Sequence, residues 1–208
     1  MPIEQAAADA LLSTTRAVRR RLDVTRPVPR SLLLECVELS QQAPTGGNAQ
    51  SWRWVIVDEP KTRKGVGELC RESAAQMQQF ADAAAARDEA HNQRIYTDAR
   101  DLALRLHEIP ALVIPCLEGQ PKPGAEQPYY ASIYPAVWSF QLAARARHLG
   151  TVLTLFHLRR QAELAALLGI PDAFMICAIL PVAYTIGDDF KPAKRPRPES
   201  IVCWNAWS

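Results

Sequence analysis

The sequence predicts an α/β or α+β sandwich formed by a single domain. Two observations lead to this fold class: apolar runs of strand length recur along the chain, and segments with helical spacing of apolar residues separate them. The chain has 208 residues, of which 48% are hydrophobic and 22% are charged, as expected for a globular domain with a sizeable core. Because no internal repeat and no linker interrupts this pattern, we expect one domain over residues 1–208.

The expected elements follow from apolar periodicity and from the residues that interrupt it. Helices are expected at 3–12, 32–42, 131–149 and 161–168, with two more inside 62–107. Strands are expected at 52–57, 111–117 and 174–186, and residues 151–156 fit either a strand or an extended loop. Ser31 is expected to cap the second helix, while Gly150 and Gly169 are expected to follow the last two helices.

Two stretches have no obvious place in the core. Large apolar residues are few around 76–93, so we expect a helical excursion or lid over 76–105. Residues 187–208 contain several prolines and a basic cluster, which predicts an extended C-terminal arm.

Composition excludes several classes of protein. A formal net charge of +2 argues against binding to nucleic acid or to an anionic membrane. The five cysteines are scattered and include no C-x-x-C pair, so no metal site is expected. The N-terminus has no basic segment of a secretory signal, and the longest apolar run, 173–186, is shorter than the roughly 20 residues that span a bilayer. We therefore expect a cytoplasmic protein.

The histidines form no metal-binding or catalytic pattern. His91, His107, His148 and His157 include no H-E-x-x-H motif and no pair at i, i+4. A G-x-S-x-G elbow, a G-x-G-x-x-G fingerprint and a Walker loop are also absent from the sequence. We therefore expect structural histidines and neither a serine hydrolase nor a conventional dinucleotide-binding fold.

The first segment with chemical potential is TTRAVRRRL at 14–22. Its arginines, among them Arg16 and Arg19, follow a helix closely enough to converge on one anion through charge-assisted hydrogen bonds. The alternative is a solvated basic turn. Binding to nucleic acid fits less well, because the run is short and contains no aromatic residue.

The second segment is the loop APTGGNAQSW at 43–52. Its paired glycines allow the backbone to approach a ligand, and Thr45, Asn48 and Gln50 offer hydrogen-bonding groups to the rim of a flat heteroaromatic ring. An ordinary turn between a helix and a strand is the alternative.

The third segment is KRPRP at 194–198. Its prolines keep the backbone extended, so Arg195 and Arg197 are expected to point the same way. A solubilising basic tail is the alternative.

Taken in order, these segments resemble the FMN-dependent nitroreductase-like family. The similarity rests on TTRAVRRRLD followed by PVP, on QAPTGGNAQSWRWVIV and on KRPRPESIV, with further support from LHEIPALVIPC and IYPAVWSFQLAARARHLGT. It extends over about 13–202. It implies an α+β sandwich with a mostly antiparallel central sheet, an extended C-terminal arm and an intertwined homodimer that holds FMN between its subunits.

The resemblance also implies a role for particular residues. Arg16 and Arg19 would bind the FMN phosphate and ribityl chain, and Ala17 stands where the family often has a serine hydroxyl. The other implied contacts are Arg195 and Arg197 at the phosphate, Pro44, Thr45, Gly46, Asn48 and Gln50 of the partner near the ring, and Leu153 and Thr154 beside the pyrimidine and N5 edge.

The implied activity is a ping-pong reaction in which NADH or NADPH reduces FMN, which then reduces a nitroaromatic, a quinone or a similar conjugated acceptor. No catalytic residue of the protein is implied, because the flavin carries the chemistry. Two alternatives remain open: a non-catalytic flavin-binding or storage module, and another flavin reaction such as enoyl or dehalogenating reduction or flavin breakdown. The stretch 76–105, where substrate selection is expected, matches no family motif.

Overall fold

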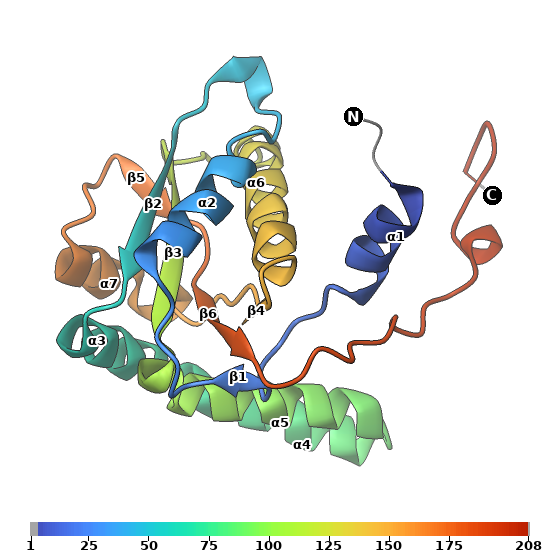
Figure 1. The fold of residues 1–208 in the computed structure, drawn as a ribbon, viewed down its shortest axis with the longest axis horizontal. Helices are drawn as coiled ribbons and strands as arrows, with labels where there is room; N and C mark the ends of the chain where they lie inside the picture. Colours follow the sequence, from blue (N-terminus) through green and yellow to red (C-terminus); the bar gives the residue numbers. More distant parts are fainter. Residues whose placement is uncertain (1–3, 208) are drawn as a thin grey trace.

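A computed structural model describes residues 4–207 and places a six-stranded sheet at the centre of the protein (Figure 1). The strands are β1 (Leu22–Asp23), β2 (Trp52–Val57), β3 (Ala111–Glu118), β4 (Leu149–Thr151), β5 (Phe174–Ile176) and β6 (Leu180–Thr185). The main path runs β1-β6-β3-β2, while β4 also pairs with β6 and β5 with β3. All pairings between these strands are antiparallel, which confirms the α+β sandwich.

Helices cover both faces of this sheet. Those in the described part of the chain are α1 (Gln5–Thr14), α2 (Arg30–Ser40), α3 (Pro60–Cys70), α4 (Ser73–Ala86), α5 (Ala90–Leu104), α6 (Gln127–Arg145) and α7 (Gln161–Leu168). One core cluster joins α2 and α6 to the sheet through residues such as Leu33 and Phe140. A second cluster joins α3, α5 and α7 to the opposite face through residues such as Val66, Leu102 and Leu164.

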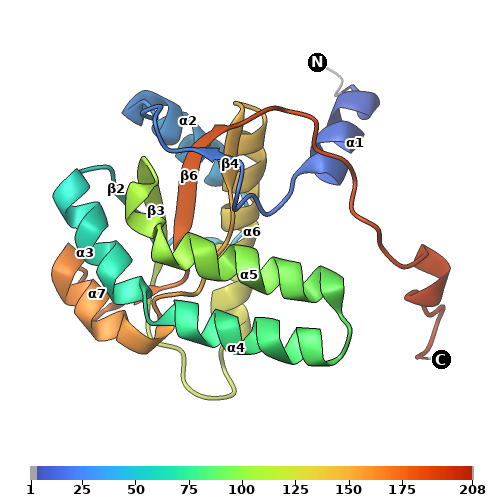
Figure 2. The ribbon, with the colours of Figure 1, turned by 90° about the horizontal axis from the view of Figure 1, so that it is seen from below.

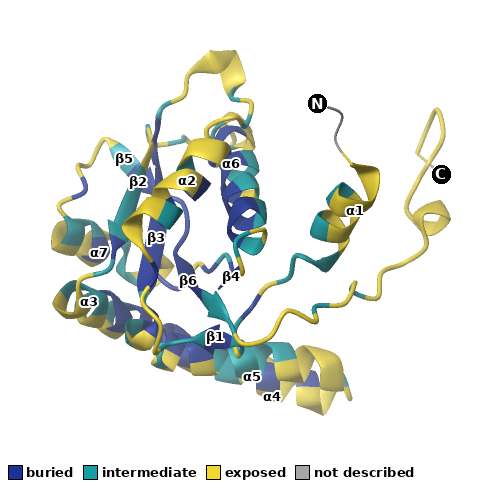
Figure 3. Cartoon of the chain, in the orientation of Figure 1, coloured by how far each residue is buried: buried dark blue, intermediate teal, exposed yellow. Residues whose placement is uncertain are grey.

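Strand β3 is the part of the sheet that both layers share. Leu112 and Ile114 pack in the α3–α5–α7 cluster, whereas Ala111 and Val113 pack in the α2–α6 cluster. Successive strand residues point to opposite faces, so a strand covered on both sides needs a continuous apolar run. This explains why the run at 111–117 is so uniformly hydrophobic and why it is dark along its length in Figure 3.

Some predicted boundaries are confirmed to the residue. The strand 52–57 and the helix 161–168 have the expected limits, and Gly169 ends that helix with a left-handed φ of 64°. The strand expected at 111–117 extends by one residue, to Glu118. The first helix lies two residues later than expected, and Ile3 falls outside the described residues.

Other expectations were wrong. The stretch 62–107 holds three helices rather than two, because α3 starts at Pro60, where the Glu59 side chain accepts hydrogen bonds from the first turn, and the chain breaks again before α4 and α5. Ser31 lies inside α2, which follows Pro29 as its N-cap. The expected strand 174–186 is two strands, β5 and β6, which pair with different parts of the sheet.

The helix expected at 131–149 was also placed wrongly. It starts at Gln127 and ends at Arg145, so Gly150 is not its C′ residue. His148 adopts the left-handed conformation after the helix, with a φ of 60°, and Gly150 belongs to β4. Residues 151–156, left open above, contain the end of β4 and an isolated bridge between Thr154 and Ile179.

The two ends of the described chain extend away from the sandwich. Helix α1 buries none of its residues, and residues after β6 carry no further strand up to 207 (Figures 1 and 2). Arg21 ties the chain after β6 to the body, since its Nη2 donates to the Asp189 carboxylate at 2.6 Å and its guanidinium lies over the Phe190 ring.

Candidate functional site

The basic segment after α1 lies along the edge of β4. The Val18 N–H donates to the Thr151 carbonyl at 3.0 Å, and Ala17 bridges the same residue. Val18 is buried in the core, so its neighbours Ala17 and Arg19 point away from that core in an extended backbone. Gly150 permits this close approach, because a Cβ there would meet Val18 Cγ1 at 3.1 Å.

A cavity of about 760 Å³ opens on the outward side of this segment. It is lined by Arg16, Ala17, Val18, Arg19, Arg20, Arg21, Asp98, Ile186, Asp189, Phe190, Lys191 and Pro192. Its two carboxylates already have cationic partners: Asp189 pairs with Arg21 at 2.6 Å, and Asp98 lies 3.8 Å from Arg20. Arg16 contributes one hydrogen bond, to the Lys191 carbonyl at 2.9 Å. The cavity therefore has more positive than negative groups.

Arg19 is the one of these cations whose pKa is lowered by burial. Burial lowers the pKa of its guanidinium, and the opposing attraction of Asp98 is the smaller effect. Within residues 4–207 its side chain makes neither a hydrogen bond nor an ion pair. Taking a cation out of water without a partner is unfavourable, so an anion bound beside Arg19 would relieve that cost.

Arg19 also lines a second cavity, of about 410 Å³. Its other lining residues are Ser73, Gln76, Met77, Phe80, Ile95, Tyr96, Ala99, Leu153, Thr154, Leu155, Phe156 and Leu158. The structure thus brings Leu153 and Thr154 to the same arginine as the basic segment. Thr154 is held in place by its hydroxyl, which donates to the Ile179 carbonyl at 2.8 Å.

The loop 43–50 is held in an unusual backbone conformation. Asn48 and Gln50 both have positive φ, at 55° and 48°, where residues other than glycine are uncommon. The Gln50 amide donates to Asn48 Oδ1 at 2.7 Å, and its backbone N–H donates to Thr45 Oγ1 at 3.3 Å. The Gly46 N–H donates to Ser132 Oγ of α6 at 3.1 Å. These contacts fix the shape of the loop.

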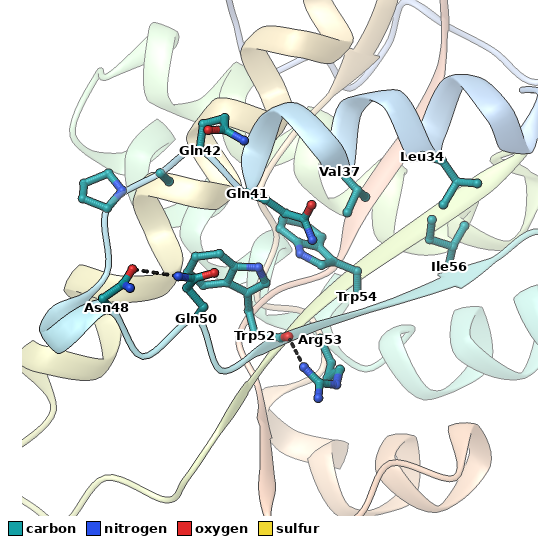
Figure 4. A pocket seen from close by; sticks show the side chains of 12 residues that line it. Leu34, Val37, Gln41, Gln42, Asn48, Gln50, Trp52, Arg53, Trp54 and Ile56 are labelled. Atoms are coloured by element: carbon teal, nitrogen blue, oxygen red, sulfur yellow. Dashed lines mark hydrogen bonds between the residues drawn. The ribbon is translucent and has the colours of Figure 1, made fainter.

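This loop does not face the Arg19 cavities of its own chain. Pro44, Asn48 and Gln50 line a separate cavity of about 780 Å³ between α2 and the outer edge of β2. Figure 4 shows Trp52 next to Gln50 and Trp54 next to Gln41 among the residues that line it. None of the residues that line this cavity also lines either of the cavities at Arg19.

The two arginines near the C-terminus are also apart from Arg19. Arg195 and Arg197 are exposed and line none of these three cavities. Arg195 donates to the Lys194 carbonyl at 3.2 Å, and the carbonyl of Arg197 accepts from Ser200 Oγ at 2.8 Å. In one chain, therefore, Arg16, Ala17, Arg19, Leu153 and Thr154 come together, and the remaining sequence candidates do not.

Sequence reasoning missed two groups that the fold adds to these cavities. Phe190 closes the basic cavity, with the guanidinium groups of Arg21 and Arg145 at 4.3 Å and 4.7 Å from its ring centroid. An aromatic residue flanked by charged residues, in DDFK at 188–191, was the available signal. Phe80 and Tyr96 line the second cavity, and nothing local in the sequence distinguishes them from ordinary helix residues.

The described residues match neither the pattern of grouped metal ligands nor that of a membrane-spanning helix. Within residues 4–207, no three His, Cys, Asp or Glu side chains are grouped as metal ligands. No described helix has the length and apolar character needed to cross a membrane.

Fold and site together define an α+β protein with a basic, half-buried cavity suited to an anionic ligand. The chain belongs to the nitroreductase family, whose sequence profile matches residues 12–184.

Two curated relatives align over nearly the whole chain. An iodotyrosine deiodinase from Thermotoga neapolitana is 29% identical over 196 residues, covering 94% of this chain and 97% of the relative. An NADH dehydrogenase from Thermus thermophilus is 27% identical, with 98% of each chain covered.

Solved structures support the same fold. An oxidised iodotyrosine deiodinase bound to FMN and 3-iodo-L-tyrosine has a TM-score of 0.70 at 27% identity, covering 95% of this chain and 98% of that chain. An FMN- and NADPH-dependent nitroreductase from Sphigopyxis sp. strain HMH has a TM-score of 0.69 at 20% identity, covering 96% and 99%.

Proposed function

We propose that this protein is an FMN-dependent oxidoreductase that takes hydride from NADH or NADPH and reduces a conjugated acceptor such as a nitroaromatic or a quinone. One observation carries the proposal: the half-buried guanidinium of Arg19, which makes no hydrogen bond or ion pair within residues 4–207, lies where two cavities meet, with Arg16 beside it. FMN has an anionic phosphate and a flat, largely apolar ring system. A basic cavity joined to an apolar one suits both parts of such a molecule.

The residues present fit that cofactor. Arg16 and Arg19 would bind its phosphate and ribityl chain, and Ala17 leaves room without contributing a hydroxyl. Leu153 and Thr154 would lie beside the pyrimidine and N5 edge. When bound, FMN would supply the hydride chemistry between donor and acceptor. The protein would orient its ligands, exclude water through the apolar walls and stabilise negative charge with fixed cations, and no side chain is assigned as acid or base.

We further propose that the site is completed by a second copy of the chain. Pro44, Thr45, Gly46, Asn48 and Gln50 would face the flavin ring of the partner. Arg195 and Arg197 would close the phosphate end. The loop is already held rigid, yet it faces away from the Arg19 cavities of its own chain. In a dimer, this loop would be available to the Arg19 cavities of the other chain.

The relatives leave room for a second activity on the same site. Dehalogenating reduction is favoured by the iodotyrosine deiodinase similarity, which extends over 94% of this chain. A flavin-binding or storage module without turnover is the non-enzymatic alternative. Both alternatives retain FMN as the bound flavin. In the first, a halogenated compound is the acceptor; in the second, the flavin is bound without turnover.

An absorbance spectrum of the purified protein tests the main proposal. We expect a flavin band that bleaches when NADPH or NADH is added without oxygen and returns when a quinone is supplied. A band that neither nucleotide bleaches would favour the storage module or a different donor. Absence of the band after incubation with FMN would refute the proposal.

The variant Arg19→Gln tests the observation on which the proposal rests. Loss of a charge-assisted contact is expected to weaken FMN binding by about tenfold or more, measured by fluorescence titration of FMN. Arg159→Gln is the matched control, because Arg159 is an exposed arginine outside all the cavities described above. Equal FMN affinity in both variants would show that Arg19 does not contribute to FMN binding.

A further inference from the structure

The cavity between the α4–α5 hairpin and residues 153–158 has an apolar, aromatic lining. The Phe80 and Tyr96 rings face each other across the hairpin, with centroids 5.4 Å apart and planes tilted by 52°. Helices α4 and α5 run side by side in Figure 2 and lie below the sheet in Figure 1. Phe80, Leu155 and Leu158 remain 41%, 44% and 58% exposed, so apolar surface is concentrated at the rim. Such surface favours an apolar ligand.

The serine and threonine hydroxyls that line this cavity donate hydrogen bonds to backbone carbonyls of the protein. Ser73 Oγ donates to the Phe156 carbonyl at 2.8 Å, and Thr154 Oγ1 donates to the Ile179 carbonyl at the same distance. Neither hydroxyl can also donate to a ligand without losing that bond. The amide of Gln76 and the Tyr96 hydroxyl are the uncharged polar groups left to set the orientation of a ligand.

The charges that line the cavity also restrict which ligands it can bind. Of its lining residues within 4–207, Arg19 alone is charged, and no carboxylate is among them. The loop that the dimer proposal brings to this site, 43–50, also has no acidic residue. An ammonium group entering here would lose its water without gaining a counter-ion, which is costly.

We infer that the part of this cavity at Phe80 and Tyr96, beyond the flavin ring at Leu153 and Thr154, selects an uncharged aromatic acceptor. Phe80 and Tyr96 are then its specificity-determining residues, and amino-acid substrates are rejected. The inference rests on the proposed function, because Arg19 is then occupied by the flavin and is not available to a substrate carboxylate. By this inference, the substrate preference of this chain differs from that of the deiodinase of known structure, which binds 3-iodo-L-tyrosine. A flat, neutral ring can stack on the aromatic pair and needs no ionic partner.

A matched pair of probes tests the inference: 2-iodophenol and 3-iodo-L-tyrosine carry the same iodinated phenol, and only the second has charged amino-acid groups. Equilibrium dialysis at slightly acidic pH, where both phenols are protonated, would measure each affinity directly. We expect 2-iodophenol to bind at least about tenfold more tightly. Equal affinities, tighter binding of the amino acid, or failure of both probes to bind would overturn the inference.

Variants locate the binding to the hairpin. Phe80→Ala is expected to weaken 2-iodophenol binding by about fivefold, as for the loss of an aromatic contact. Leu104→Ala is the control, because Leu104 lies in α5, is 39% exposed and lines neither of the Arg19 cavities. An equal effect of both variants, or none of Phe80→Ala, would contradict the assignment.

The same samples separate this inference from the proposed function. FMN retention is read from the absorbance spectrum before dialysis, and dialysis is run with and without added FMN. Failure to retain FMN refutes the proposed function and also removes the occupant of Arg19 on which the inference depends. Retention of FMN together with preference for 3-iodo-L-tyrosine refutes the inference and leaves the flavin proposal standing.

Discussion

Arg19 is half-buried, whereas His157 is fully buried. Burial lowers the pKa of each side chain. Arg19 stays charged and lies at two cavities, where a ligand can reach it. His157 is fully buried, with Nε2 at 3.2 Å from the Ile176 carbonyl and Nδ1 without a partner among the described residues. It is therefore a neutral structural residue, as the sequence led us to expect.

His157 should make the protein less stable in mild acid. The unfolded state takes up a proton near the ordinary pKa of 6.5, while the folded state takes it up at lower pH. Stability from this group is therefore complete above pH 6.5 and falls as the pH drops toward the folded value, by at most about 1.4 kcal/mol per pH unit. His157→Phe removes this titration.

Urea unfolding of the wild type and of His157→Phe across this pH range would check the expectation. The free energy of unfolding should depend less steeply on pH in the variant, even if its value is lower throughout because the bond to Ile176 is lost. Identical slopes would show that His157 does not carry the effect.

At the scale of elements, local pattern located most helices and strands but not all of their boundaries. β2 was predictable because its aromatic and β-branched residues favour strands. The C-terminus of α7 was predictable because a glycine follows it. The division of 174–186 into β5 and β6 was not, because both pieces are apolar and only their different partners, seen in space, separate them. Gly150 was wrongly expected to follow a helix for the same reason: its place in β4 depends on packing against distant residues such as Val18.

Gly150 should be intolerant of a side chain. A Cβ there would lie 2.8 Å from Thr185 Cγ2 and 3.0 Å from Leu22 Cδ2, so Gly150→Ala is expected to destabilise the protein by about 1–3 kcal/mol. The variant should also loosen the basic segment at Val18, against which it packs. Urea denaturation measures the first effect, and FMN titration the second.

Gly65→Ala provides the comparison. Gly65 lies within α3, and the atoms nearest to its added Cβ belong to the side chain of Leu167, which is 44% exposed and can move. Alanine has a higher helix propensity than glycine, which offsets the cost of the close contact with Leu167. We therefore expect little change in the free energy of unfolding. A loss at Gly65 as large as that at Gly150 would contradict this account of the close approach.

At the scale of the whole molecule, the chain leaves unusual apolar surface uncovered. Ile201, Trp204 and Trp207 are 71%, 84% and 96% exposed on a segment that extends from the sandwich (Figure 1). Large exposed aromatic residues favour association, because their burial against a partner removes them from water. Together with the outward-facing loop 43–50, this surface supports the proposed homodimer.

Replacing the two tryptophans should weaken that dimer. The wild type is expected to sediment at about twice the chain mass of 23.1 kDa. The double variant Trp204→Ala, Trp207→Ala should dissociate at a concentration at least about tenfold higher, because two large apolar contacts are lost. Leu104→Ala serves again as the control for an exposed residue. A wild type that sediments as a monomer at micromolar concentration would exclude the dimer.

The sequence by itself determined the fold class, the apolar central strand and the presence of a basic segment, because periodicity and composition are local properties of the chain. It also supplied the order of motifs that indicated the family, which the profile match to 12–184 then confirmed. Only the tertiary structure decided which candidates meet. Arg16, Arg19, Leu153 and Thr154 converge, while the loop 43–50 and the C-terminal arginines lie elsewhere in the same chain. Proximity between distant segments depends on how β4, β6 and the α4–α5 hairpin pack, and no local pattern encodes that packing.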